Sequence, residues 1–258
     1  MKKFLIFALA LFICLSTSCS VFKHINPKIE GKIKKETKYE RIIITSTRLA
    51  GRYTMFDASS IKRFLNKIYE AKDITAETKF EPDFFIEFYD SNKKVATFKY
   101  IAGITDETQP NLIDEDGNRY YVDNSIEDEF IKRIMKKEMF KGAKEYYVSL
   151  LEDVIERIPK KGIGNNKIYI DINKDYMVTK YLTSVDMFNI FDSIKNNSVE
   201  ISDSIDNADY VVTIVTNTYN DTKVVANVVI KNKNNVVQRL LYEGNRAGDK
   251  ITYFIKNK

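Results

Sequence analysis

The chain has 258 residues and a net charge of +5, and 44% of its residues are hydrophobic with 12% aromatic. This content is typical of globular folding rather than disorder, and the mild basic excess lacks the clustering that nucleic-acid-binding proteins need. The one histidine, His24, and the two cysteines, Cys14 and Cys19, all lie near the N-terminus. Histidine and thiolate catalysis, and zinc sites built from these residues, are therefore excluded from the rest of the chain.

The N-terminal segment is expected to be an export signal. Two lysines precede an apolar run at residues 4–15, and three small residues follow. A membrane span needs about twenty apolar residues, so this shorter run predicts a cleaved signal peptide over residues 1–18. Because the small residues end on Cys19, the segment resembles the signal of bacterial lipoproteins, although Ser16 stands where that family usually has leucine. Ordinary cleavage after Ser16 or Ser18 and a retained N-terminal helix are the alternatives.

The resemblance implies that Cys19 becomes the N-terminus of the exported protein and is acylated, for example with palmitate, which anchors the chain to the bilayer. Ser20 stands where an aspartate would retain such a lipoprotein in the inner membrane, so the resemblance implies the outer membrane if the cell has two membranes. The protein would then face either the periplasm or the cell surface. Cleavage would leave a net charge of +3 and one cysteine, so no intramolecular disulfide is expected.

The sequence predicts an α+β protein of two small domains, each an antiparallel sheet packed against one to three helices. Residues 19–40 are lysine-rich, show little periodicity and are expected to form a lipidated tether. The first domain is expected at 41–158 and the second at 167–258, each long enough to bury a core. The segment 159–166, which starts with proline and contains two glycines, is expected to be the linker.

The first domain is expected to contain a strand, a helix, two hairpins and two more helices. Their expected positions are 41–47, 57–68, 84–101, 111–122, 125–137 and 143–158. The helix at 57–68 places Ile61, Phe64, Leu65 and Ile68 on one face, with Asp57 or Ser59 as its cap. The dipeptide Asp116-Gly117 favours the tight turn of the second hairpin.

The second domain is expected to contain a strand, a helix capped by Thr183 and Asp186, and four more strands. The strands are expected at 167–172, 209–217, 223–231, 236–242 and 251–255. Polar turns between the last four favour an antiparallel meander packed on the helix. Residues 167–230, including the run Asn207–Val212, loosely resemble lipoprotein domains that assist envelope assembly. The resemblance contains no catalytic motif.

Two S-x-x-K patterns, Ser59–Lys62 and Ser91–Lys94, are similar to part of the active site of penicillin-recognising enzymes. The accompanying K-T-G element is absent, and Ser59 is expected to act as a helix cap. The glycine-rich loops that bind nucleotide phosphates are also absent, so no nucleotide cofactor is expected.

Two acidic clusters remain, Asp114–Asp116 and the set of Asp203, Asp206 and Asp209. The first lacks the glycine and glutamate positions of a calcium loop and is expected to be a hairpin turn. The second is expected to be a group of surface acids, with a weak cation site as the alternative. Five aromatic residues near loops are candidates for a partner-binding surface: Tyr53, Phe56, Tyr120, Tyr121 and Tyr219.

These observations favour a membrane-anchored, non-enzymatic lipoprotein that binds a protein or other component of the cell envelope. Lipid attachment at Cys19 is the expected modification, and no catalytic residue, metal or cofactor is expected. A surface-exposed lipoprotein that acts as an antigen, adhesin or inhibitor is one alternative. A hydrolase that uses carboxylates is the other, because the separation of paired carboxylates is a three-dimensional property.

Overall fold

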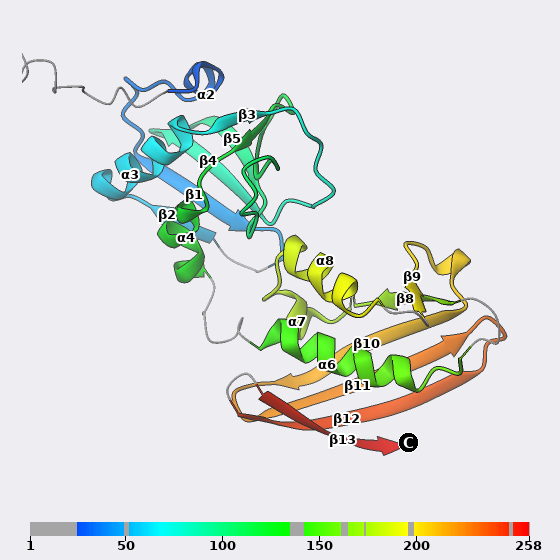
Figure 1. Ribbon diagram of the computed structural model, residues 1–258. Coiled ribbons are helices and arrows are strands. Elements are labelled where there is room, and N and C mark those ends of the chain that lie inside the picture. Colours follow the sequence, from blue (N-terminus) through cyan, green and yellow to red (C-terminus); the bar gives the residue numbers. More distant parts are fainter. Residues whose placement is uncertain are drawn as a thin grey trace, which may run out of the picture.

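The computed structural model describes residues 25–48, 52–134, 142–160, 165–172, 174–195, 199–247 and 250–257. The predicted signal, His24 and Cys19 lie outside these residues. The described chain contains two sheets, each with helices packed on one face (Figure 1). This confirms the α+β class with two sheet-bearing regions, which we call the first unit and the second unit. Within the described residues, no helix is long and apolar enough to cross a membrane.

The first unit is built on a seven-stranded sheet of order β2-β1-β4-β5-β6-β7-β3, and all neighbouring strands are antiparallel. Its strands are β1 (Arg41–Ser46), β2 (Arg52–Met55), β3 (Lys72–Ile74), β4 (Phe84–Asp90), β5 (Lys93–Tyr100), β6 (Leu112–Asp114) and β7 (Arg119–Tyr121). Its helices are α2 (Pro27–Lys32), α3 (Ala58–Tyr69) and α4 (Glu127–Ile134), with a 3-10 turn at Asn124–Ile126.

The core of the first unit follows the two-residue period of its strands. Phe84, Ile86 and Phe88 alternate along β4 and are fully buried. Helices α3 and α4 cover this face of the sheet, where Phe130 meets Phe84 and Phe64 edge to face. Among the described residues, no helix of the first unit covers the opposite face of the sheet.

Part of the predicted tether packs into this core. Ile29 and Ile33 are fully buried and Tyr39 is 5% exposed. The Asn26 side chain caps α2 by accepting from the backbone N–H of Lys28 and Ile29. The expectation of a tether reaching residue 40 is therefore wrong for residues 26–40, because the surrounding lysines obscured the spacing of the two isoleucines on one helical face.

The second unit is built on a six-stranded sheet of order β13-β12-β11-β10-β8-β9. Its strands are β8 (Asn166–Asp171), β9 (Val199–Ile201), β10 (Tyr210–Tyr219), β11 (Lys223–Asn232), β12 (Val237–Ala247) and β13 (Lys250–Asn257). The last four form the expected antiparallel meander. Strand β8, however, is parallel to both β10 and β9, so the sheet is mixed rather than purely antiparallel.

Three helices belong to the second unit: α6 (Ala143–Glu156), α7 (Tyr176–Thr179) and α8 (Ser184–Ser193). Helix α6, expected in the first domain, instead buries Tyr146, Tyr147, Leu150, Leu151 and Val154 in the second core. Figure 1 shows α6 and α8 above the same face of the sheet. The apolar stripe of a helix does not identify the sheet that it covers, so proximity along the chain gave the wrong assignment.

The segment 159–166 consequently connects α6 to β8 within the second unit and does not separate two domains. Asn166 is buried at its end and donates a hydrogen bond from Nδ2 to the Pro159 carbonyl at 2.9 Å. The chain passes between the units after α4, through residues that lie outside the described part.

Candidate functional site

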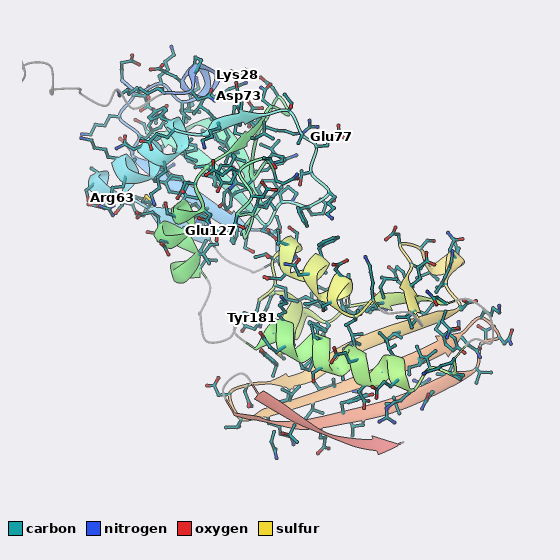
Figure 2. The ribbon with its side chains drawn as sticks, viewed as in Figure 1. Lys28, Arg63, Asp73, Glu77, Glu127 and Tyr181 are labelled. Carbon is teal, nitrogen blue, oxygen red and sulfur yellow. The ribbon has the colours of Figure 1, made fainter. Side chains whose placement is uncertain are left out.

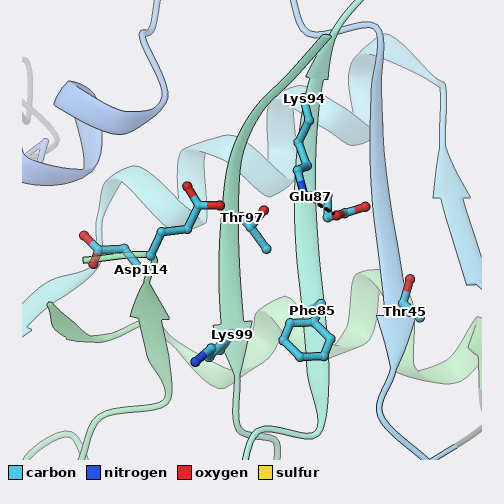
Figure 3. Close-up of a pocket in the computed structure, with 8 residues that line it drawn as sticks. Thr45, Phe85, Glu87, Lys94, Thr97, Lys99 and Asp114 are labelled. Carbon is cyan, nitrogen blue, oxygen red and sulfur yellow. Dashed lines mark hydrogen bonds and ion pairs between the residues drawn. The ribbon is translucent and has the colours of Figure 1, made fainter. Parts of the chain in front are cut away.

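The face of the first sheet that lacks helices contains a hollow of about 540 Å³ (Figure 3). Phe85 pairs with Thr45 and Lys99 on the neighbouring strands, and Glu87 pairs with Thr97, so these side chains share one face. We call this feature the sheet hollow. It is lined by Thr45, Phe85, Glu87, Lys94, Thr97, Lys99, Asp114 and Glu115.

One side of the sheet hollow is fixed by polar contacts. Lys94 donates from Nζ to the Glu87 carboxylate at 3.0 Å, and the Tyr89 hydroxyl donates to the other Glu87 oxygen at 3.1 Å. The hydrogen bond to Glu87 raises the pKa of Lys94 above its ordinary value. Because both Glu87 oxygens are engaged, this pair gives the hollow a defined wall.

The exposed lining groups, Phe85, Lys99 and Glu115, are available to a ligand. Lys99 and Glu115 are exposed, and neither side chain has a hydrogen bond or ion pair within the described part of the chain. The Thr97 hydroxyl is shielded from solvent and also lacks a partner there. Phe85 adds an aromatic ring that is 38% exposed. A buried hydroxyl without a partner is uncommon.

Asp114, in the lining, has a structural role. Its two carboxylate oxygens accept hydrogen bonds from the backbone of Asp116 and Asn118, the Asn118 amide and the Tyr120 hydroxyl, at 2.8–3.0 Å. Burial raises its pKa, but these hydrogen bonds outweigh burial, so the pKa of Asp114 lies below its ordinary value. Asp116 pairs with Lys32, and Gly117 takes the positive φ of the turn. The first acidic cluster is thus a hairpin turn, as expected.

The second acidic cluster does not converge on one point. Asp203 and Asp206 are exposed, whereas Asp209 accepts from the Lys167 backbone N–H at 3.1 Å and from Lys233 Nζ at 3.4 Å. In the part of the chain that the structure describes, no three His, Cys, Asp or Glu side chains are placed to hold a metal ion.

Neither S-x-x-K pattern brings its serine to its lysine. The Ser59 hydroxyl donates to Asp57 at 2.6 Å, and the Ser91 hydroxyl donates to Glu40 at 3.5 Å. Asp57, rather than Ser59, is the cap of α3, and the hydrogen bonds from Ser59 and Ser60 lower the pKa of Asp57 to about 2. Both patterns therefore have local structural explanations.

Comparison with known proteins gives one similarity. Residues 35–140 match a family described as YhfM protein. The match covers less than half of the chain, but it contains every strand of the first sheet and all the lining of the sheet hollow. Searches of curated proteins and of solved structures find no match.

Four of the five aromatic candidates for a partner surface lie in the matched segment, and two of these are buried. Tyr120 is 0% and Tyr121 6% exposed, while Tyr219 in the second unit is 5% exposed. The prediction is wrong for these three, because they are core-facing strand residues near strand ends. Tyr53 packs partly against the first core, and Phe56 is 69% exposed.

A buried polar contact between the two units was missed by the sequence reasoning. Asp83 is 2% exposed, forms an ion pair with Arg48 and accepts from the Ala102 backbone N–H at 3.0 Å. It also accepts from the backbone N–H and the hydroxyl of Ser184, at 2.8 and 3.2 Å. Burial raises the pKa of Asp83. The positive charge of Arg48 opposes this effect, but the pKa of Asp83 still lies above its ordinary value. We call Asp83, Arg48 and Ser184 the junction cluster.

Two further carboxylates are largely enclosed. Glu127, which lies on the side of the first unit nearer the second (Figure 2), accepts from the Tyr100 hydroxyl at 2.9 Å and the Gly103 backbone at 2.8 Å. Asp175 accepts from the Tyr147 hydroxyl at 2.7 Å and from Thr216. Burial raises the pKa of both carboxyls. Their hydrogen bonds join separate elements, which gives each a structural role.

Proposed function

We propose that the protein is a membrane-anchored, non-enzymatic lipoprotein whose first unit binds a protein component of the cell envelope through the sheet hollow. The observation that supports this most is the combination of an open hollow, an exposed aromatic ring and two exposed charges of opposite sign, Lys99 and Glu115. Protein interfaces combine aromatic anchors with polar groups that need partners in this way.

The proposed lipid anchor would favour binding of a membrane partner at the sheet hollow. Acylation of Cys19 would hold the first unit close to the bilayer and raise its concentration near membrane partners. Ser20 favours the outer membrane in a cell with two membranes. The hollow lies within the segment that matches the YhfM family, so the same site is a candidate in other members.

The anchor is tested by Cys19→Ser. We expect the variant to leave the membrane fraction and remain folded, because lipid attachment, and not the fold, would hold the protein there. Cell fractionation with circular dichroism of the recovered protein measures both properties. A membrane fraction equal to that of the wild type would overturn the anchoring proposal.

The binding site is tested by cross-linking in cells and pull-down with Phe85→Ser combined with Lys99→Glu. Val237→Ser combined with Lys231→Glu, on exposed positions of the second sheet, is the matched control. We expect a reproducible envelope protein with the wild type and control, and about tenfold less with the hollow variant, as for loss of an interface anchor. Equal recovery with both variants would contradict the site. Cleavage by added protease on intact cells would indicate the surface-exposed alternative.

A further inference from the structure

A second pocket lies on the other side of the first unit, between residues 35–39 and helix α3. Its volume is about 270 Å³. Helix α3 covers the core face of the sheet, so this pocket is separate from the sheet hollow on the open face. We call it the lysine pocket. It is lined by Lys35, Thr37, Lys38, Tyr39, Ala58, Ile61, Lys62, Leu65, Asn66 and Tyr69.

The lining of the lysine pocket carries three positive charges, and Glu30 and Glu36 lie close enough to act on its tyrosines. The lining itself includes Lys35, Lys38 and Lys62 and no carboxylate. These three lysines are exposed, and within the described residues none has a hydrogen bond or ion pair from its side chain. Lys28, on helix α2, has a partner by contrast, because it forms an ion pair with Asp73 at 3.1 Å (Figure 2). Like charges around a concave surface attract anions.

The interior of the lysine pocket is mostly apolar. Ile61 and Leu65 contribute aliphatic side chains from one face of α3, and the rings of Tyr39 and Tyr69 complete the wall. Both tyrosines are more than nine-tenths buried. A wall of this kind favours the apolar part of a ligand, as in most small-molecule sites.

The two tyrosines of this wall also carry hydroxyls that are shielded from solvent. The hydroxyls of Tyr39 and Tyr69 have no hydrogen bond, and with the Thr97 hydroxyl they are the buried side-chain atoms in this condition among the described residues. Thr37 and the Lys34 backbone lie near the Tyr39 hydroxyl, and their interaction with it opposes the effect of burial on its pKa. Burial raises the pKa of both tyrosines, so both hydroxyls stay protonated and can donate. All three unpartnered atoms thus belong to residues that line a hollow or pocket.

We propose that the lysine pocket binds a small carboxylate with an apolar body. The body lies between Ile61, Leu65 and the tyrosine rings, and the carboxylate lies at the rim near the three ammonium groups. A water molecule occupies about 30 Å³ in the liquid, so the pocket volume corresponds to a ligand of about nine non-hydrogen atoms. A medium-chain fatty acid or a simple aromatic acid has this size and chemistry.

The proposal is tested by calorimetric titration of the full chain carrying Cys19→Ser with three probes. Octanoate has both the chain and the charge, octan-1-ol has the chain alone, and acetate has the charge alone. We expect saturable binding of octanoate at one site and binding of the other two that is at least about tenfold weaker, because each lacks one of the two recognised features. No saturable binding of octanoate at millimolar concentration would overturn the proposal.

Variants then locate the site. Lys35→Gln, Lys38→Gln and Lys62→Gln together should weaken octanoate binding about tenfold, as expected for several exposed charges. They should leave octan-1-ol binding unchanged. The matched control replaces Lys93, Lys223 and Lys231, which lie outside the pocket, by glutamine, so the net charge changes equally. It should leave octanoate binding unchanged.

A filling variant tests the apolar part. Leu65→Trp should abolish octanoate binding, and Ala58→Leu at the edge of the same pocket is the second variant if Leu65→Trp unfolds. Octanoate affinity that survives both the filling variant and the lysine variant would place the binding elsewhere and contradict the proposal. This outcome is independent of the sheet hollow, whose own variants do not alter the lysine pocket.

Discussion

At the scale of single residues, a buried hydroxyl without a partner changes the effect of replacing tyrosine by phenylalanine. Tyr69 loses no hydrogen bond in this substitution. We therefore expect Tyr69→Phe to leave the free energy of unfolding unchanged or to raise it by up to about 1 kcal/mol. Urea denaturation measures this change.

Tyr120→Phe is the matched control for that prediction. Tyr120 is also buried, but its hydroxyl donates to the Asp114 carboxylate at 3.0 Å. Loss of a hydrogen bond to a charged group should lower the free energy of unfolding by about 1.5–3 kcal/mol. Equal losses for the two variants would show that the Tyr69 hydroxyl has a partner after all.

The buried carboxyl of Asp175 gives a prediction about pH. Burial raises its pKa above the ordinary 3.8, although hydrogen bonds from Tyr147 and Thr216 oppose this. Between the ordinary and the raised pKa, the folded protein binds more protons at this group than the unfolded chain does. The contribution of Asp175 to the free energy of unfolding should therefore fall as the pH rises through that interval.

The measurement compares wild type with Asp175→Asn by chemical denaturation at a series of pH values. The stability of the wild type relative to this variant should fall with rising pH across the interval. Asp203→Asn, at an exposed carboxyl of the same unit, is the control variant. A relative stability that rises with pH would show that the folded state favours the Asp175 carboxylate.

At the scale of secondary-structure elements, local signals predicted the structure well where they were sufficient. Thr183 and Asp186 form a reciprocal capping box at the start of α8, as their types and spacing indicate. The hairpin of β4 and β5 follows from two alternating runs around a polar turn. Both cases depend on residues close together in the chain.

Local signals did not predict the short strands or the sheet that each helix covers. Strands β2, β3 and β9 have three or four residues each, and they are defined by the strands that they pair with. The lining of the sheet hollow was missed for a similar reason. Glu87 and Thr97 alternate with core residues in the sequence, but only the position of α3 and α4 decides which face is open.

At the scale of the whole molecule, the junction cluster connects the two units through a helix end. The backbone N–H of Ser184, at the start of α8, donates to Asp83 of the first unit. The first N–H groups of a helix lack partners within the helix, and a negative charge there is favourable. Arg48 balances the buried charge and donates to the Leu182 carbonyl at 3.2 Å. The first unit thus helps to cap a helix of the second.

An aromatic contact lies beside this polar one. The Phe80 ring of the first unit meets the Phe188 ring of α8 at 5.6 Å, nearly perpendicular, and the Lys79 ammonium lies 3.4 Å from the Phe188 ring centre. Together the two contacts hold α8 against the first unit. If the sheet hollow binds an envelope partner, they also determine where the second unit lies relative to that partner.

The junction contacts predict that the relative position of the two units depends on Asp83 and Phe188. Asp83→Asn combined with Phe188→Ala should leave both sheets folded, because neither side chain belongs to the hydrophobic core of either unit. It should broaden the distance distribution between spin labels at Lys93 and Asn234, measured by electron paramagnetic resonance. It should also speed hydrogen exchange at the first amides of α8, because their acceptor is weakened.

The control is Asp153→Asn, which removes contacts to Arg157 and Tyr242 inside the second unit. It should change neither the label distances nor the exchange at the start of α8. An unchanged distance distribution in the junction variant would mean that other contacts hold the two units together. Faster exchange with unchanged distances would limit the role of Asp83 to capping α8.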